Sequence, residues 1–282
     1  MLLLAHFIEL EPERWLRRMP GRVTLLTRLK SIENGARVVV KRFEGGAGRE
    51  GWHERLFGRR VRSEARREFE ILGDLGTVGI PVPRPIRCVE NREASSLRPM
   101  GTRGRSVVVM ECIEHIEDAR KALGQLGSAD RRNLLGEVLR IARKLHERGW
   151  IHRDLYLQHF LLPCASEGSL VLIDVGRARW SRNPGRRWLV KDLAALQLSA
   201  PANVTRSERL RFLFGWLRGQ GVREQVGWKR WARQVIMKAR RLGAHQPRFE
   251  DGEQVVGVQP ERSVSGGAGT REASERLTLD HE

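Results

Sequence analysis

Two aspartate-centred segments constrain this chain more than any other feature of its sequence. The first, Ile151 to Phe160, reads IHRDLYLQHF, and the second, Ile173 to Gly176, reads IDVG after a short apolar run. The interval between Asp154 and Asp174 leaves space for a short hairpin, so the two carboxylates end up in adjacent loops. Phosphoryl transfer needs such a pair, because one carboxylate takes the proton of the acceptor hydroxyl and the other holds magnesium against the phosphates. The pattern predicts ATP-dependent kinase chemistry.

The first segment follows the kinase catalytic loop H-R-D-x-x-x-x-N up to its last fixed position. His159 stands five residues after Asp154, where the pattern has asparagine. A neutral imidazole also ligates divalent metals. Asp154 is therefore the predicted catalytic base, and His159 and Asp174 are the predicted ligands of Mg²⁺.

The residues upstream can supply the groups that bind ATP. Lys41 ends a β-branched run, as does the kinase lysine that binds the α- and β-phosphates. A glutamate on the following helix must hold this lysine, and Glu64, Glu68 and Glu70 are the candidates. We predict Glu68, because the helix then has room to end before Pro81.

The adenine site and the loop over the phosphates are harder to place. The apolar run Val107–Met110 reads as a buried strand that leads into a hinge, where backbone groups of Glu111 and Ile113 would bind adenine. No G-x-G-x-x-G precedes the predicted ATP lysine. We expect the loop that covers the phosphates in residues 29–35 or in residues 44–51.

The order of the elements predicts an α+β, bilobal protein-kinase-like fold with a small β-rich N-lobe and a larger helical C-lobe. Arg22 to Phe43 reads as strand, turn and strand, with Asn34-Gly35 at the turn. Helices are expected at Ser63–Leu75, Asp118–Leu126, Asp130–Gly149, Asp192–Leu198, Glu208–Leu217 and Val222–Leu242. The expected units are an N-lobe at residues 1–111, a C-lobe at residues 112–245 and a disordered tail at residues 246–282.

At these motifs the chain resembles the lipopolysaccharide kinase (Kdo/WaaP) family, over roughly Arg22 to Leu217. The matching segments are Gly149 to Tyr156 with His159-Phe160-Leu161-Leu162, Ile173-Asp174 with Arg177-Ala178, and Arg187 to Ala194. In that family the asparagine position of the catalytic loop is likewise histidine. The long arginine-rich loop after the ATP lysine and the tail depart from the family pattern.

The resemblance implies a protein-kinase-like fold that uses ATP and Mg²⁺ to phosphorylate a sugar of the lipopolysaccharide inner core. It implies that Asp154 is the base, Asp174 a metal ligand and Lys41 the phosphate-binding lysine. In such folds an aspartate in the position of Asp192 lies under the catalytic loop and accepts hydrogen bonds from its backbone N–H groups.

Two other functions remain open at this point. Only 18 residues separate Asp174 from Asp192, which leaves no room for a long regulated activation loop and favours a glycolipid acceptor, a core heptose or Kdo, over a protein. A small atypical protein Ser/Thr kinase is the first alternative. An inactive, basic binding module of kinase-like fold is the second, although the set of Lys41, Asp154 and Asp174 speaks against inactivity.

Charge and apolar patterning limit the partners and the location. The chain has 52 Lys and Arg against 34 Asp and Glu, a net charge of +18, which suits an anionic glycolipid or the surface of an anionic membrane. Nucleic acid is not expected as a partner, and the oligomeric state stays open. Neither a signal peptide nor an apolar run long enough to span a bilayer is recognisable. Three widely spaced cysteines fit a reducing cytoplasm, so we expect a cytoplasmic protein in peripheral contact with the inner membrane face.

Overall fold

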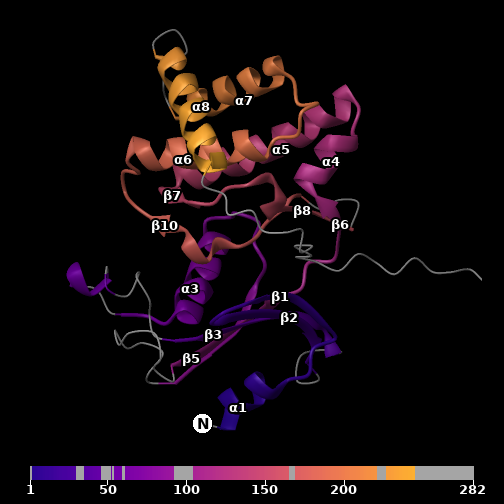
Figure 1. Cartoon of the computed structure of the whole chain (residues 1–282), viewed down its shortest axis with the longest axis vertical. Coiled ribbons are helices and arrows are strands. Elements are labelled where there is room, and N and C mark those ends of the chain that lie inside the picture. Colours follow the sequence, from indigo (N-terminus) through magenta and orange to yellow (C-terminus); the bar gives the residue numbers. More distant parts are fainter. Residues whose placement is uncertain are drawn as a thin grey trace, which may run out of the picture.

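The computed structural model describes residues 2–29, 35–45, 52, 54–58, 61–91, 104–164, 169–220 and 227–244. Figure 1 shows a sheet with two flanking helices in the lower part of the molecule and a group of helices above it. The predicted α+β class, with strands before helices, is confirmed. Among the described helices none combines the length and the apolar character needed to span a bilayer. Asn34 and the expected tail, residues 246–282, lie outside the described residues.

A five-stranded antiparallel sheet forms the first part, in the order β1-β2-β3-β5-β4. Its strands are β1 (Arg14–Met19), β2 (Arg22–Arg28), β3 (Arg37–Glu44), β4 (Pro85–Glu90) and β5 (Arg105–Glu111). The predicted strand pair is present as β2 and β3, with Arg22 opposite Phe43 and Thr24 opposite Lys41. The sequence did not indicate β1, because its charged residues hide the one buried side chain, Leu16.

Two helices cover opposite faces of this sheet (Figure 1). Side chains alternate between the faces of a strand, so Val38 and Val40 pack with Phe7 of α1 (Leu2–Glu9) on one side. Lys41, one position further along β3, faces α3 (Glu64–Thr77) on the other side. The helix α3 begins as predicted, since the Ser63 side chain accepts a hydrogen bond from the backbone N–H of Arg66.

The second part is mainly helical. It contains α4 (Ala119–Gln125), α5 (Ser128–Glu147), α6 (Arg186–Ser199), α7 (Arg206–Gly219) and α8 (Trp228–Ala244). Helix α6 begins six residues earlier than predicted, because its first turn carries arginines that mask the helical periodicity and Gly185 occupies the cap position. Residues 222–226 of the predicted last helix lie outside the described residues.

Short strand pairs hold the two aspartate segments side by side. Strands β8 (Phe160–Pro163) and β9 (Val171–Leu172) form the predicted hairpin, which also pairs with β6 (His115–Asp118). On the other side of the loops, β7 (Trp150–Ile151) pairs with β10 (Arg179–Trp180). Between these pairings lie the 3₁₀ turns η3 (Leu157–His159) and η4 (Val175–Arg177). Both loops are therefore fixed at their two ends.

Candidate active site

Six of the seven residues that the sequence singled out line one cleft between the sheet and the helical part. They are Lys41, Glu68, Glu111, Ile113, His159 and Asp174. The seventh, Asp154, adjoins this group through its backbone oxygen, which lies 2.9 Å from Nδ1 of His159. Residues that are up to 133 positions apart in the chain, such as Lys41 and Asp174, meet here only through the fold.

Lys41 and Glu68 form a buried ion pair at the back of the cleft. The Lys41 Nζ to Glu68 Oε1 distance is 2.5 Å, and the two side chains are 8% and 2% exposed. Glu70, another candidate, pairs instead with Arg62 on the outside of α3. The lysine also lies 3.5 Å from Oδ1 of Asp174, so the pair holds it toward the cleft. Either charge alone would be costly to bury, which makes the pair a unit.

Asp174 has two cations and one histidine as close neighbours. Its Oδ1 lies 3.2 Å from Arg22 Nη2 as well as near Lys41, and its Oδ2 lies 3.9 Å from His159 Nε2. Burial alone would raise the pKa of the Asp174 carboxyl, but Lys41, His159 and Arg22 together hold that pKa well below its usual range. The carboxylate therefore stays ionised at any physiological pH.

The backbone around Asp174 is held in an uncommon conformation. Its φ of 57° lies in the left-handed region, which non-glycine residues rarely adopt outside functional sites. Two residues on, a Cβ at Gly176 would meet Glu68 Oε2 at 3.2 Å. Glycine at this position therefore lets the loop lie directly against the glutamate of the ion pair.

His159 is oriented as a ligand would be. Its Nδ1 faces the Asp154 carbonyl, which can only accept, so Nδ1 carries the hydrogen and Nε2 of the neutral ring is unprotonated. This Nε2 faces Asp174. The two residues thus fit a divalent cation, but no group of three or more His, Cys, Asp or Glu suited to a metal occurs in the described part of the chain. A magnesium ion here would need nucleotide phosphates and water as its remaining ligands.

Asp154 lies between two cations that the sequence reasoning did not assign. Its Oδ2 is 2.7 Å from Arg177 Nη1, and its Oδ1 is 3.3 Å from Lys191 Nζ. Lys191 also donates to the backbone oxygen of Arg153. Burial lowers the pKa of the Lys191 ammonium, although Asp154 opposes the shift. The sequence signal for Lys191 is its place directly before Asp192, within the segment Arg187 to Ala194 that resembles the family.

Asp192 is fully buried beneath the catalytic loop, as predicted. Its carboxylate accepts hydrogen bonds from the backbone N–H of His152 at 2.8 Å and of Arg153 at 2.7 Å. It also lies 3.2 Å from Nε2 of His146, whose Nδ1 accepts from the indole of Trp216 and so leaves the hydrogen on Nε2. One carboxylate therefore sets the backbone of the two residues before Asp154.

Neither connection that the sequence offered as a cover for the phosphates is among the described residues that line the cleft. Residues 29–35 follow the far end of β2, because Arg28 pairs with Arg37 while Thr24 pairs with Lys41. The β1–β2 hairpin lies over the cleft instead, and its Leu16, Arg17 and Arg22 line it. Of the second candidate, residues 44–51, only Glu44 and Gly45 are described. The Pro20-Gly21 turn between two strands was the available signal.

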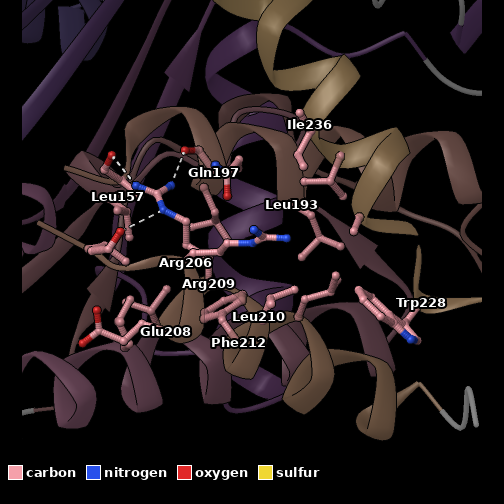
Figure 2. A pocket seen from close by; sticks show the side chains of 18 residues that line it. Leu157, Leu193, Gln197, Arg206, Glu208, Arg209, Leu210, Phe212, Trp228 and Ile236 are labelled. Carbon is pink, nitrogen blue, oxygen red and sulfur yellow. Dashed lines mark hydrogen bonds between the residues drawn. The ribbon is translucent and has the colours of Figure 1, made fainter. Parts of the chain in front are cut away.

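A second cavity lies within the helical part, away from the cleft. It has a volume of about 430 Å³ and is enclosed by side chains of α5, α6, α7 and α8. Figure 2 shows Leu193, Leu210 and Phe212 on its walls, with Arg206 among them. Arg209 is turned away from the cavity's apolar walls, because its guanidinium donates to backbone oxygens of α6 and the following turn. No sequence pattern pointed to this cavity.

The chain is similar to known kinases in sequence and in fold. A family model described as the lipopolysaccharide kinase (Kdo/WaaP) family matches residues 8–215. The lipopolysaccharide core heptose(I) kinase WaaP of Pseudomonas aeruginosa is 35% identical over 130 residues, which cover 43% of this chain and 47% of that protein. The RIO-type serine/threonine-protein kinase Rio1 of Haloferax volcanii is 28% identical over 127 residues, 45% of this chain and 38% of that protein.

The similarity in fold covers a larger part of the chain than the similarity in sequence. A solved structure described as WaaP in complex with acyl carrier protein superposes with a TM-score of 0.60 at 25% identity, covering 85% of this chain and 92% of that one. By sequence, the matched segments span less than half the length of these curated relatives.

Proposed function

The chain belongs to the lipopolysaccharide kinase (Kdo/WaaP) family, and we propose that it is a phosphotransferase that moves the γ-phosphoryl group of ATP to a sugar hydroxyl of lipopolysaccharide core. A core heptose is the favoured acceptor, because heptose(I) kinases are among the relatives. The cofactors of this proposal are ATP and Mg²⁺.

The observation that carries the proposal is the division of the cleft into two chemical halves. Lys41, Glu68 and Asp174 form one ionic group on the nucleotide side. Asp154 stands apart from that group and forms its ion pairs with Lys191 and Arg177. Phosphoryl transfer uses such a division, in which one set of groups binds the phosphates and metal and a separate carboxylate orients the acceptor hydroxyl.

Bound MgATP would supply the phosphoryl group and a metal charge in this cleft. Lys41 would bind the phosphates, with Glu68 holding its ammonium in place, and the hinge at Glu111 and Ile113 would bind adenine. Asp154 would orient the acceptor hydroxyl and take its proton as the new O–P bond forms and the bond to the leaving ADP oxygen breaks.

Lys191 and Arg177 each contact one carboxylate oxygen of Asp154, so an acceptor hydroxyl must displace one of them to reach the carboxylate. An incoming phosphoryl group carries negative charge into the same space and would draw the two cations toward itself. Arg177 is 60% exposed at its side chain and has room to move, whereas Lys191 is 17% exposed and held by Arg153. We propose that Lys191 stabilises the transferring group and that Arg177 leaves Asp154 when the acceptor binds.

The acceptor is tested by offering labelled ATP to the pure chain with lipopolysaccharide core and, separately, with generic acidic and basic proteins. We expect label in the glycolipid. Label in protein alone would favour the alternative of a protein Ser/Thr kinase, to which the Rio1 match gives some support. No label together with no ATP binding would favour an inactive kinase-like module.

The metal role of Asp174 and His159 predicts two different responses in a magnesium titration of activity. Asp174→Ala should raise the magnesium requirement strongly, because it removes a charged oxygen ligand. His159→Ala should raise it less, since imidazole nitrogen is a weaker ligand for Mg²⁺ than carboxylate oxygen. Asp130→Ala, which changes an exposed aspartate of α5 away from the cleft, serves as the control. If His159→Ala titrates like the unchanged chain, His159 only packs against the loop.

An acyl carrier protein is a proposed partner, because the similar WaaP structure contains one. The apolar cavity of about 430 Å³ suits a hydrocarbon chain such as an acyl group. In the labelling assay, added acyl carrier protein should raise the label transferred to the glycolipid, because it would keep more of the chain in its active form. Leu193→Glu, which places a charge in the cavity, should abolish that gain, and an equal gain in this variant would contradict the partner.

The proposed location is the cytoplasmic side of the inner membrane, in peripheral contact with it. There the chain would meet both ATP and a glycolipid acceptor. The positive charge favours such contact with anionic lipid, and salt should weaken it, because exposed charges are screened over about 8 Å at physiological ionic strength.

A further inference from the structure

Residues 52 and 54–58 reverse the usual distribution of apolar and charged side chains. Trp52, Leu56 and Phe57 are 62%, 80% and 64% exposed, more than any other large apolar side chain in the described part of the chain. Glu54, between them, is only 6% exposed. A segment that merely lay on the surface would bury its apolar residues and expose its acid.

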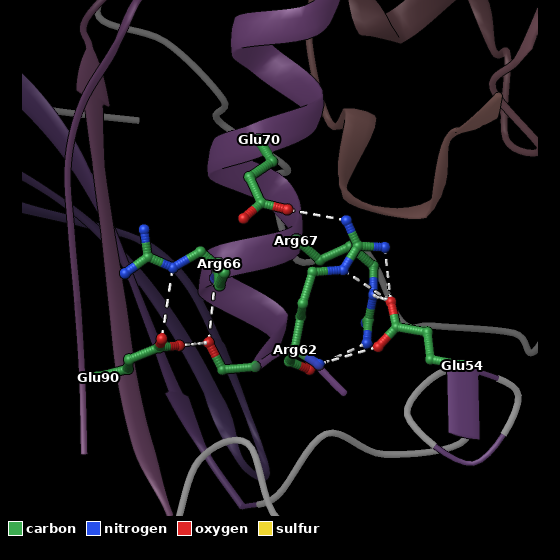
Figure 3. Close-up of polar contacts among 7 residues, drawn as sticks. Glu54, Arg62, Arg66, Arg67, Glu70 and Glu90 are labelled. Carbon is green, nitrogen blue, oxygen red and sulfur yellow. Dashed lines mark hydrogen bonds and ion pairs between the residues drawn. The ribbon is translucent and has the colours of Figure 1, made fainter. Parts of the chain in front are cut away.

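The buried acid anchors this segment to the body of the protein (Figure 3). Glu54 Oε1 lies 2.6 Å from Arg62 Nη2 and 3.3 Å from Arg67 Nε, and Oε2 accepts from the backbone N–H of Arg62 at 2.9 Å. Burial opposes its ionisation, but these contacts hold the pKa of the Glu54 carboxyl below its ordinary value. The three apolar side chains are therefore held outward by an ionic attachment to α3.

The charge around the segment selects an anionic surface as its partner. Residues 49–67 contain seven arginines and three glutamates, a net charge of +4 by sequence. Three of these arginines, Arg62, Arg66 and Arg67, are paired with glutamates, so the attraction to an anionic surface comes from the other four and from the net charge of +18 of the whole chain. Exposed Trp, Leu and Phe next to arginine are the combination that settles at the headgroup level of a bilayer. Three side chains offer too little area for a stable protein interface, which buries roughly 1,200 Å² or more in total.

The attachment point also connects the segment to the catalytic cleft. Glu54 binds Arg67 on α3, the helix that carries Glu68, and α3 packs against η4, which contains Arg177 beside Asp154. A surface held at this segment would therefore have a defined orientation toward the acceptor side of the cleft. This step rests on the proposed glycolipid acceptor, whose sugar is presented from a membrane.

We propose that Trp52, Leu56 and Phe57 form a wedge that inserts into the headgroup region of an anionic bilayer and orients the cleft toward a membrane-held acceptor.

Sedimentation with vesicles tests the wedge directly. The full chain and a variant with Trp52→Ser, Leu56→Ser and Phe57→Ser are mixed with phosphatidylcholine vesicles that do or do not contain phosphatidylglycerol. We expect the triple variant to lose about tenfold or more in affinity for the anionic vesicles. A control, Ile116→Ser with Met237→Ser, changes two exposed apolar side chains elsewhere and should bind like the unchanged chain. Equal vesicle binding by the triple variant would overturn the wedge.

Two further readouts separate this proposal from others. Phosphoryl transfer to a water-soluble core oligosaccharide, without detergent, should be the same for the unchanged chain and the triple variant. If the kinase proposal is wrong, neither protein transfers phosphate, and this result does not depend on how strongly each protein binds vesicles. A dimer that the triple variant converts to a monomer would instead make the segment an interface between copies and overturn the wedge. Leu56→Asp, a single change at an 80% exposed position, repeats the test without risk to folding.

Discussion

Asp154→Asn is expected to lower turnover by about 10² or more, in line with the loss of a positioned general base. The amide has the shape of the carboxylate but cannot take the proton of the acceptor hydroxyl. The change also leaves Arg177 and Lys191 without their shared anion, so both cations would be freer to pair with phosphate. ATP affinity should therefore be unchanged or slightly higher.

Turnover and ATP binding are measured on the same purified protein, and Asp74→Asn, a change at an exposed aspartate of α3, is the matched control. The melting temperature should stay near that of the unchanged chain, because Asp154 lies at the edge of the cleft and its partners are partly exposed. Near-normal turnover in the folded variant would contradict the assignment of Asp154 as the general base.

Asp192→Ala is expected to cost about 3 kcal/mol or more of folding stability, since unsatisfied buried donors cost roughly 1–3 kcal/mol each. The backbone N–H groups of His152 and Arg153 would lose their acceptor, and so would the ring of His146. For a chain of this size the loss corresponds to a fall in melting temperature of roughly 6–12 °C. Turnover should fall as well, because the same bonds set the backbone before Asp154.

Thermal melting compares Asp192→Ala with Asp192→Asn. The asparagine keeps one acceptor oxygen, so its melting temperature should lie between those of Asp192→Ala and the unchanged chain. Ser199→Ala provides a reference for the loss of an uncharged buried side chain, whose hydroxyl accepts from the backbone N–H of Leu157 at 2.9 Å and donates to the backbone oxygen of Ala195 at 2.8 Å. An Asp192→Ala protein that melts like the unchanged chain would mean that the catalytic loop keeps its conformation without this carboxylate.

Much of the site was predictable because its chemistry uses local patterns. Lys41 follows a β-branched run, and Glu68 was chosen among three glutamates because the helix then has room to end before Pro81. The structure has the ion pair with these partners. The hairpin between the aspartate segments likewise followed from a short apolar run.

The loop over the phosphates shows where local patterns fail. Two connections were candidates because they flank Lys41 in the sequence. The first begins after Arg28, at the end of β2 that lies away from Lys41, and most of the second lies outside the described residues. The β1–β2 hairpin covers the cleft although β1 reads as charged and exposed. Arg22 reaches Asp174 across 152 positions, and no spacing rule connects such residues.

By itself, the sequence determined that a β-rich part precedes a helical part, and it identified Lys41, Glu68, Asp154, His159 and Asp174 as site candidates, because periodicity, caps and motif spacing act between neighbours along the chain. Only the tertiary structure decided that Lys191 and Arg177 flank Asp154, that four helices enclose an apolar cavity, and that buried Glu54 holds Trp52, Leu56 and Phe57 outward. Each of these depends on desolvation and on contacts between segments that are distant in sequence, and burial is a property of the packed chain rather than of any residue in it.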